Sequence, residues 1–174
     1  HREHRFLIMA PVKLLFVCLG NICRSPAAEN LMNHALEQRG LGGQVVCDSA
    51  GTSNYHIGAR PDRRMTAALA QDPGLAAVGS ARQFHRGDFE AFDLILAMDR
   101  DNYRDILALD REGIYGDRVK LMSEFCRQAK YRDMQDVPDP YYGGDAGFRL
   151  VIDLLTDACD GLLEQLHAEG KVSA

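Results

Sequence analysis

Several features that would place the sequence in a common class of protein are missing. The longest clean apolar run, LLFVCL, is much shorter than the ~18 to 20 residues of a membrane-spanning helix. Lysine and arginine number 20 against 25 aspartates and glutamates, a net charge of −5, and no basic block stands out. Neither a nucleic-acid surface nor an anionic-membrane surface is therefore predicted. An anionic substrate would have to be attracted by a local positive site.

The first ten residues lack the apolar length and the cleavage pattern of a signal peptide. We expect residues 1–10 to be an N-terminal extension or tag remnant outside the fold, and residues 11–170 to form one domain. Within that extension Met9 is the expected native start, which leaves residues 1–8 as the tag remnant or added segment. Five cysteines without a leader indicate a reducing, cytoplasmic location rather than a disulfide framework, with leaderless secretion left open. The sequence has no CxxC pair and no zinc-finger spacing, so neither a metal nor a cofactor is expected.

Strand and helix patterns alternate along the chain. Continuous apolar segments predict strands over 12–18, 44–51, 92–98 and 117–122. Helical spacing predicts helices over 26–39, 61–71, 99–109 and 146–168, the last interrupted by Gly161, and 128–145 is expected to be a long functional loop. In the first helix, Ser25 is expected as the N-cap, Pro26 as the first residue and Gly40 as the stop. This order predicts a single α/β domain with a central, mostly parallel four-stranded sheet and helices on both faces.

The stretch VCLGNICRSP, residues 17–26, joins the first strand to the first helix, where ligands bind in such folds. Backbone N–H groups in a tight loop, backed by a helix dipole, form a cradle for an anion. Gly20 lets the chain bend, Asn21 tolerates left-handed backbone angles, and Arg24 offers a fork for two phosphate oxygens. Cys18 is then predicted to be a thiolate, held by the Ser25 hydroxyl. The stretch predicts phosphoryl transfer through a phosphocysteine intermediate.

Such a reaction needs a proton donor for the leaving oxygen and later a base for water. Asp139, between two prolines in VPDPYYGG, is the best candidate, although an Asp-Pro pair is usually only a turn. A Cys-x5-Arg spacing is equally weak in isolation, and the surrounding strand, turn and helix pattern gives it weight. The acidic residues of MDRDN are expected to cap a helix. The other cysteines and histidines are expected to have packing or surface roles, and they are Cys47, Cys126, Cys159, His34, His56, His85 and His167.

From about residue 11 to 167 the motifs resemble those of the low-molecular-weight protein tyrosine phosphatases, and SPAAE resembles bacterial members. LFVCLGNICRSPAAE resembles the phosphate loop and its helix, and DSAGTS, ARQF, FDLILAMDRDN and DPYYG follow in the family order. The resemblance implies that Cys18 is the nucleophile, Arg24 the phosphate clamp and Asp139 the general acid. It implies that Ser49 braces Asn21. Backbone donors to phosphate are implied for Leu19, Gly20, Asn21, Ile22 and Cys23.

The resemblance also implies features beyond the reaction itself. Cys23 matches a second loop cysteine that forms a reversible disulfide with the nucleophile in some members. Tyr55 matches an aromatic wall of the substrate cleft, and Tyr141 with Tyr142 matches the tyrosine pair beside the acid. Gly79 is a departure, because many members carry a histidine there that supports a hydrogen bond. The implied partners are a phosphotyrosine protein such as a bacterial tyrosine kinase, inhibitory phosphate or other oxyanions, and a weak homodimer.

Three other functions are compatible with parts of this pattern. Arsenate reductases with the same loop need a second redox cysteine pair, and the chain has no cysteine between Cys47 and Cys126. Arginine phosphatases carry threonine at the position of Ile22, which favours phosphotyrosine. A non-catalytic phosphate-binding module would be expected to lose Cys18, Arg24 or Asp139, and all three are present.

Overall fold

A computed structural model describes residues 10–141 and 143–173 of the chain. Within these residues lies a four-stranded sheet in the order β2-β1-β3-β4, with every neighbouring pair parallel. The strands are β1 Val12–Cys18, β2 Val45–Gly51, β3 Leu94–Ala97 and β4 Val119–Leu121. All four predicted strands are confirmed; the second is one residue shorter than predicted, and the third and fourth are each three residues shorter.

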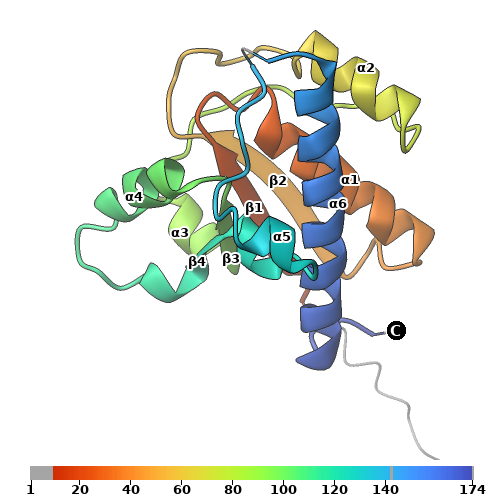
Figure 1. Cartoon of the computed structure of the whole chain (residues 1–174). Helices are drawn as coiled ribbons and strands as arrows, with labels where there is room; N and C mark the ends of the chain where they lie inside the picture. The colour runs from red at the N-terminus through yellow and green to blue at the C-terminus, as the bar shows by residue number, and fades with distance from the viewer. Residues whose placement is uncertain (1–9, 142, 174) are drawn as a thin grey trace, which may run out of the picture.

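Helices cover both faces of the sheet, as predicted (Figure 1). The α-helices of the described residues are α1 Arg24–Gln38, α2 Arg63–Gln71, α3 Asp88–Ala91, α4 Arg100–Ala108, α5 Ala129–Arg132 and α6 Asp145–Ala168, with short 3-10 helices η1 Gly116–Arg118 and η2 Met122–Phe125. Successive residues of a strand face opposite sides of a sheet. Accordingly Leu14 and Phe16 pack into the core under α1 and α6, while Leu15 and Val17 pack into the core under α3 and α4. Both cores therefore fix β1, whose end carries the predicted nucleophile.

The prediction for the start of the first helix was wrong by two residues. Helix α1 begins at Arg24, its N-cap is Cys23, and no side chain caps it. Ser25 lies inside the first turn and is fully buried, with its hydroxyl toward Cys18 rather than toward the helix N–H groups. The N–H groups at the start of α1 are therefore not occupied by a side-chain cap and can bind an anion at the loop. The predicted stop is confirmed, since Gly40 follows the helix with a left-handed φ of 69°.

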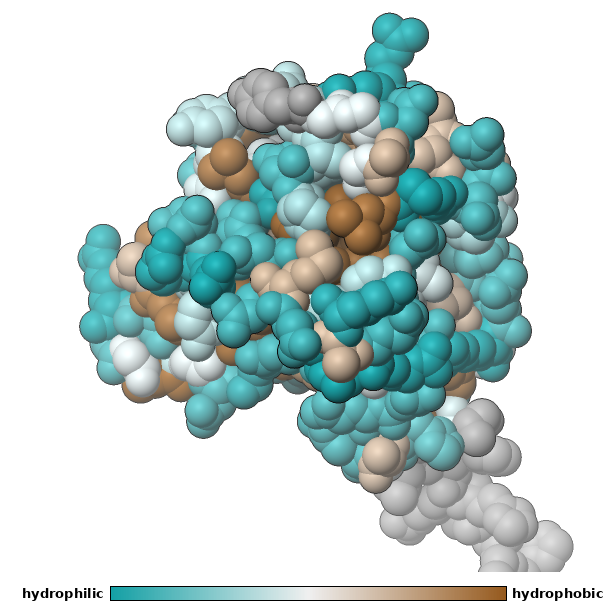
Figure 2. Space-filling model, viewed as in Figure 1, coloured by the Kyte–Doolittle hydropathy of each residue, from teal (hydrophilic) through white to brown (hydrophobic). Residues whose placement is uncertain are grey.

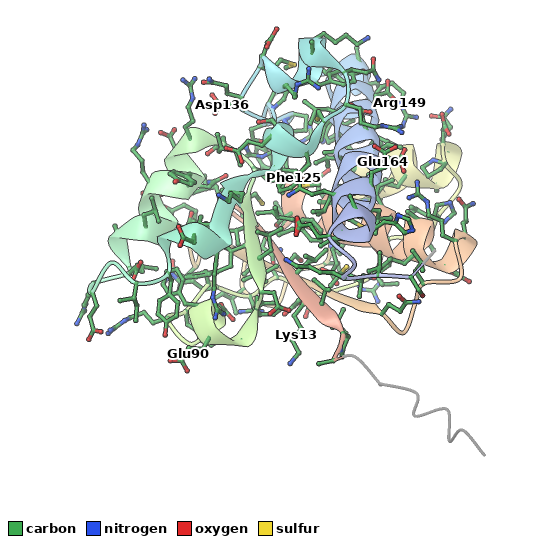
Figure 3. All side chains as sticks on the ribbon, turned by 90° about the horizontal axis from the view of Figure 1, so that it is seen from below. Lys13, Glu90, Phe125, Asp136, Arg149 and Glu164 are labelled. Carbon is green, nitrogen blue, oxygen red and sulfur yellow. The ribbon has the colours of Figure 1, made fainter. Side chains whose placement is uncertain are left out.

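Gly161 has a packing role in the middle of α6. A Cβ atom there would lie 1.8 Å from the carbonyl oxygen of Phe125. The backbone at the end of η2 therefore lies directly against the helix, as Figure 3 shows for Phe125 beside α6. The segment 128–145, predicted as one long loop, contains the short helix α5 and continues to the acid candidate Asp139.

The surface seen in Figure 2 is mostly hydrophilic, with small separate hydrophobic patches. In the part of the chain that the structure describes, no helix is long and apolar enough to cross a membrane.

Candidate active site

Cys18 is the last residue of β1, and its side chain is buried beneath the loop that follows. The backbone N–H of Asn21 donates to Cys18 Sγ at 3.3 Å, and Ser25 Oγ lies 3.0 Å from the same sulfur. Asn21 has a φ of 55°, which confirms the left-handed backbone predicted for it. The loop thus folds back over the sulfur.

The loop turns its carbonyl groups outward. Thr52 N–H donates to Cys18 O at 2.9 Å, Ser53 N–H to Leu19 O at 2.9 Å and Asp62 N–H to Ile22 O at 2.6 Å. In a planar trans peptide the N–H of the next residue points opposite to the carbonyl. The N–H groups of Leu19, Gly20 and Cys23 therefore aim to the inner side of the loop. Converging N–H groups at a helix start form a binding site for an oxyanion.

The side chain of Asn21 holds the loop from behind. Its Nδ2 donates to Ser25 Oγ at 2.8 Å and to Ser49 Oγ at 2.9 Å. Its Oδ1 accepts the backbone N–H of Arg82 at 2.9 Å. Asn21 is 3% exposed, so these bonds are shielded from water. Ser49 thus contacts Asn21 directly, in the arrangement implied by the family resemblance.

The end of β2 lies against this loop. A Cβ atom on Gly51 would be 2.7 Å from the carbonyl oxygen of Leu19 and 3.1 Å from the N of Asn21. Only glycine allows so close an approach. On the other side, a Cβ on Gly20 would lie 2.9 Å from Cδ2 of His56. The loop is packed on two sides, which fixes its shape before any anion binds.

Arg24 is buried and anchored through one nitrogen. Its Nη1 donates to Asp99 Oδ2 at 2.7 Å and to the carbonyl oxygen of Val137 at 3.0 Å. Its Nη2 lies 3.7 Å from Asp139 Oδ2. Burial by itself lowers the pKa of Arg24, but Cys18, Asp99 and Asp139 outweigh it and raise the pKa above its ordinary value. The guanidinium therefore stays charged.

Asp139 faces Arg24 from the loop between α5 and α6. Its side chain is 43% exposed, and its Oδ1 accepts the N–H of Tyr141 at 3.0 Å. The preceding segment is fixed to the end of β3, because Val137 N–H donates to the carbonyl oxygen of Met98 at 2.8 Å. Asp139 is thus both a turn residue and a carboxylate held beside the guanidinium.

A cleft of about 240 Å³ unites these groups. Its lining residues are Cys18, Leu19, Gly20, Ile22, Cys23, Arg24, Tyr55, His56, Asp139 and Tyr141. Asn21, Ser25 and Ser49 are not part of its lining and act from behind, and Tyr142 lies outside the described residues. A larger hollow of about 620 Å³ lies near Lys13 and Glu90 (Figure 3), but no cysteine, serine or histidine lines it. Of these two, the smaller cleft is the one lined by cysteine, arginine and aspartate together.

Comparison with known proteins is consistent with this geometry. Residues 13–172 match the family model described as low molecular weight phosphotyrosine protein phosphatase. The chain belongs to that family. A Synechocystis protein, provisionally named a low molecular weight protein-tyrosine-phosphatase, is 60% identical over 158 residues, covering 91% of this chain and 98% of its own.

Two solved structures give a similar result. A protein tyrosine phosphatase from Entamoeba histolytica is 44% identical, with a TM-score of 0.83, covering 92% of this chain and 99% of its own. A Drosophila arginine phosphatase is 28% identical, with a TM-score of 0.80, covering 88% and 97%. The predicted family and fold are confirmed. The fold itself is shared by proteins named for two different phosphorylated side chains.

Several residues of this phosphatase site were missed from the sequence. Asp99 was expected only as a helix cap, and it does cap α4 by accepting Asn102 N–H at 2.7 Å on Oδ1. Its second oxygen binds Arg24. His56 was assigned a surface or packing role, yet its ring lines the cleft. The only sequence signal for His56 was its place beside Tyr55.

Glu29 was also missed. It accepts the Ser49 hydroxyl at 2.6 Å and thereby extends the chain of contacts behind Asn21. Burial raises the pKa of the Glu29 carboxyl, and Asp48 adds to the rise, while the hydrogen bond from Ser49 opposes it. Glu29 sits one turn into α1, where a glutamate is usually an exposed residue of no special role.

The five cysteines of this phosphatase chain all lie in the described residues and are free. Burial, with Asp62 and Cys18 adding to it, raises the pKa of the Cys23 thiol well above its ordinary value. Burial raises the pKa of Cys47 and of Cys126 to about 12. These three thiols are therefore protonated at neutral pH and are poor nucleophiles. The implied disulfide between Cys18 and Cys23 stays a prediction.

Among the described residues, no group of three or more histidine, cysteine, aspartate or glutamate side chains could hold a metal ion.

Proposed function

We propose that this chain hydrolyses phosphotyrosine in proteins, and small aryl phosphates, through a phosphocysteine formed on Cys18. The observation that carries the proposal is the union of three groups in one cleft. Cys18 lies under inward N–H groups, Arg24 is held charged beside it, and Asp139 approaches Arg24 Nη2 to 3.7 Å. A nucleophile, an anion clamp and a proton donor are what phosphate monoester hydrolysis needs.

In the first step, the Cys18 sulfur attacks phosphorus and forms the S–P bond while the bond from phosphorus to the tyrosyl oxygen breaks. Protonated Asp139 gives its proton to that oxygen, so tyrosine leaves as a neutral phenol. The loop N–H groups and Arg24 stabilise the charge on the three other oxygens. Ser25, 3.0 Å from the sulfur, stabilises the thiolate by donating its hydroxyl proton.

In the second step, Asp139, now ionised, accepts a proton from water. The water oxygen forms a bond to phosphorus as the P–S bond breaks, which releases phosphate and restores the Cys18 thiolate. Asp139 regains its proton in this step, so it serves as acid and then as base. Free phosphate and other tetrahedral oxyanions fit the same cradle, so we expect them to inhibit competitively.

The aromatic walls favour an aryl phosphate. Tyr55 and Tyr141 line the cleft, 73% and 38% exposed, and can enclose a phenyl ring between them. The Drosophila arginine phosphatase with the same fold makes phosphoarginine the second candidate substrate. Ile22 lines this cleft with a side chain that offers a guanidinium no acceptor, which favours phosphotyrosine.

The proposed partner is a phosphotyrosine protein such as a bacterial tyrosine kinase, and the proposed location is the cytoplasm, where free cysteines persist. A weak homodimer and a role of Tyr142 beside the acid belong to the same proposal. No cofactor takes part in the proposed reaction.

Turnover of a phosphotyrosine peptide and of para-nitrophenyl phosphate in the presence of EDTA tests the function. Cys18→Ser should abolish activity, and Asp139→Asn should slow it by roughly 10²- to 10⁴-fold, the usual contribution of general acid–base catalysis. Phosphoarginine and arsenate are assayed separately, as the substrates of the two alternative enzyme functions. Failure of the reduced wild-type protein to hydrolyse any aryl phosphate would overturn the proposal.

A further inference from the structure

The first turn of α2 contacts both halves of the cleft. The N–H of its N-cap, Asp62, donates to the carbonyl oxygen of Ile22 in the phosphate loop at 2.6 Å. Two residues later, Arg64 Nη2 donates to the carbonyl oxygen of Tyr141, in the loop that carries Asp139, also at 2.6 Å. Figure 1 shows α2 beside the start of α6, where that loop ends. One rigid turn therefore links the nucleophile loop to the acid loop.

The Arg64 guanidinium is held from several directions. It lies 5.4 Å from the ring centroid of Tyr141 and 4.9 Å from that of Phe148 in α6. Its Nε lies 3.6 Å from Asp62 Oδ1, which also accepts the backbone N–H of Arg64 at 2.9 Å. A guanidinium that lies over two aromatic rings and also donates a hydrogen bond is restricted in orientation, although the side chain is 44% exposed.

These contacts reach the acid through a single residue. The carbonyl of Tyr141 is bonded by Arg64, and its N–H is bonded to Asp139 Oδ1 at 3.0 Å. Movement of the Tyr141 backbone would therefore move the hydrogen bond that orients the carboxyl group. The other oxygen, Oδ2, is the one that faces Arg24.

We propose that Arg64 is a positioning residue for the general acid, setting the orientation of Asp139 through the Tyr141 backbone. This inference rests on the proposed phosphatase function. It predicts that the loss of Arg64 slows the first chemical step only for substrates with a poor leaving group, because only a poor leaving group needs the proton of Asp139. A highly acidic phenol leaves as the anion and does not depend on how the carboxyl is oriented.

The test compares kcat/KM for phenyl phosphate, whose leaving group needs protonation, with kcat/KM for 2,4-dinitrophenyl phosphate, whose leaving group does not. Arg64→Gln removes the charge and the fork, and Arg64→Lys retains the charge. Arg63→Gln is the matched control, since Arg63 is exposed in the same turn and has no hydrogen-bond, ion-pair or ring partner among the described residues. The same Arg64→Gln change is also made in the Asp139→Asn background.

Arg64→Gln should lower kcat/KM for phenyl phosphate by about tenfold to hundredfold, the scale of a misplaced catalytic group. For 2,4-dinitrophenyl phosphate the loss should stay below about threefold, and Arg64→Lys should restore part of the difference. In the Asp139→Asn background, Arg64→Gln should have no further effect on phenyl phosphate. The control variant should behave as wild type on both substrates.

Equal losses on the two substrates would overturn the inference, because a role in stability or in binding the ring does not distinguish leaving groups. An undiminished Arg64→Gln effect without Asp139 would overturn it as well. A wild-type protein that hydrolyses neither substrate would instead overturn the proposed function, so the two failures are distinguishable. Thermal unfolding of each variant confirms that folded proteins are compared.

Discussion

Replacement of Asn21 tests the phosphate loop most sharply, because backbone and side chain contribute separately there. Asn21 combines a φ of 55° with three side-chain hydrogen bonds, to Ser25, to Ser49 and from Arg82. Asn21→Ala removes the bonds and places an unfavourable residue in the left-handed region. Asn21→Gly removes the same bonds but tolerates the backbone angle.

The expected magnitudes follow from these contacts. Three buried hydrogen bonds at about 1 kcal/mol each predict a loss of about 3 kcal/mol for both variants. For Asn21→Ala, left-handed strain adds about 1 to 2 kcal/mol. For Asn21→Gly, the greater freedom of the unfolded chain adds about 0.4 to 1 kcal/mol instead. The midpoints of these two ranges differ by about 0.8 kcal/mol, so Asn21→Gly should be more stable than Asn21→Ala by about that amount.

Urea unfolding measures the stability of both variants, and kcat/KM for an aryl phosphate measures how well the phosphate loop still supports catalysis. We expect both variants to lose about a hundredfold in kcat/KM, because the N–H groups around Cys18 would no longer converge. If Asn21→Ala were as stable as wild type, the bonds behind the loop would contribute nothing. If it were at least as stable as Asn21→Gly, the left-handed backbone would be refuted.

Two further predictions concern helix packing and pH. Gly161→Ala should lower the free energy of unfolding, measured in urea, by about 2 kcal/mol or more, because its Cβ would lie 1.8 Å from Phe125 O. Gly147→Ala in the same helix should be neutral or stabilising, and equal stabilities of the two variants would contradict the prediction. Burial raises the pKa of Glu29 in the folded state, so wild-type stability falls as pH rises from the unfolded to the folded pKa. Glu29→Gln should therefore gain stability over wild type between acid and neutral pH, and a constant difference in urea midpoints would contradict it.

The sequence predicted the parts of the site that are continuous in the chain. An apolar strand, a loop with Gly20 and Asn21 and a helix after it are local patterns, and the structure forms each of them, although the helix begins at Arg24 rather than at Pro26. Ser25 was misjudged as a helix cap, because its position fits a cap equally well. Its hydroxyl lies 3.0 Å from Cys18 Sγ instead, which agrees with the second role predicted for it, as a partner of the sulfur.

Contacts between distant segments were not predictable from these patterns. Asp99 capping α4 while binding Arg24, Glu29 bonding Ser49, and Arg64 bonding the acid loop all depend on how the parallel strands align. Gly161 was noted only as an interruption of a helix, since nothing local indicates that a backbone carbonyl packs against it. Long-range packing decides such roles, and single-residue preference does not.

The most direct test of the central claim is the capture of the phosphorylated cysteine. Asp139→Asn, mixed with 2,4-dinitrophenyl phosphate, should form the intermediate without acid assistance and hydrolyse it slowly for want of a base. The reaction is stopped with denaturant at alkaline pH, and the digested protein is mapped by mass spectrometry. The account predicts phosphate on the peptide containing Cys18, and none in the Cys18→Ser protein. Turnover without that phosphopeptide, or phosphate bound at another residue, would contradict it.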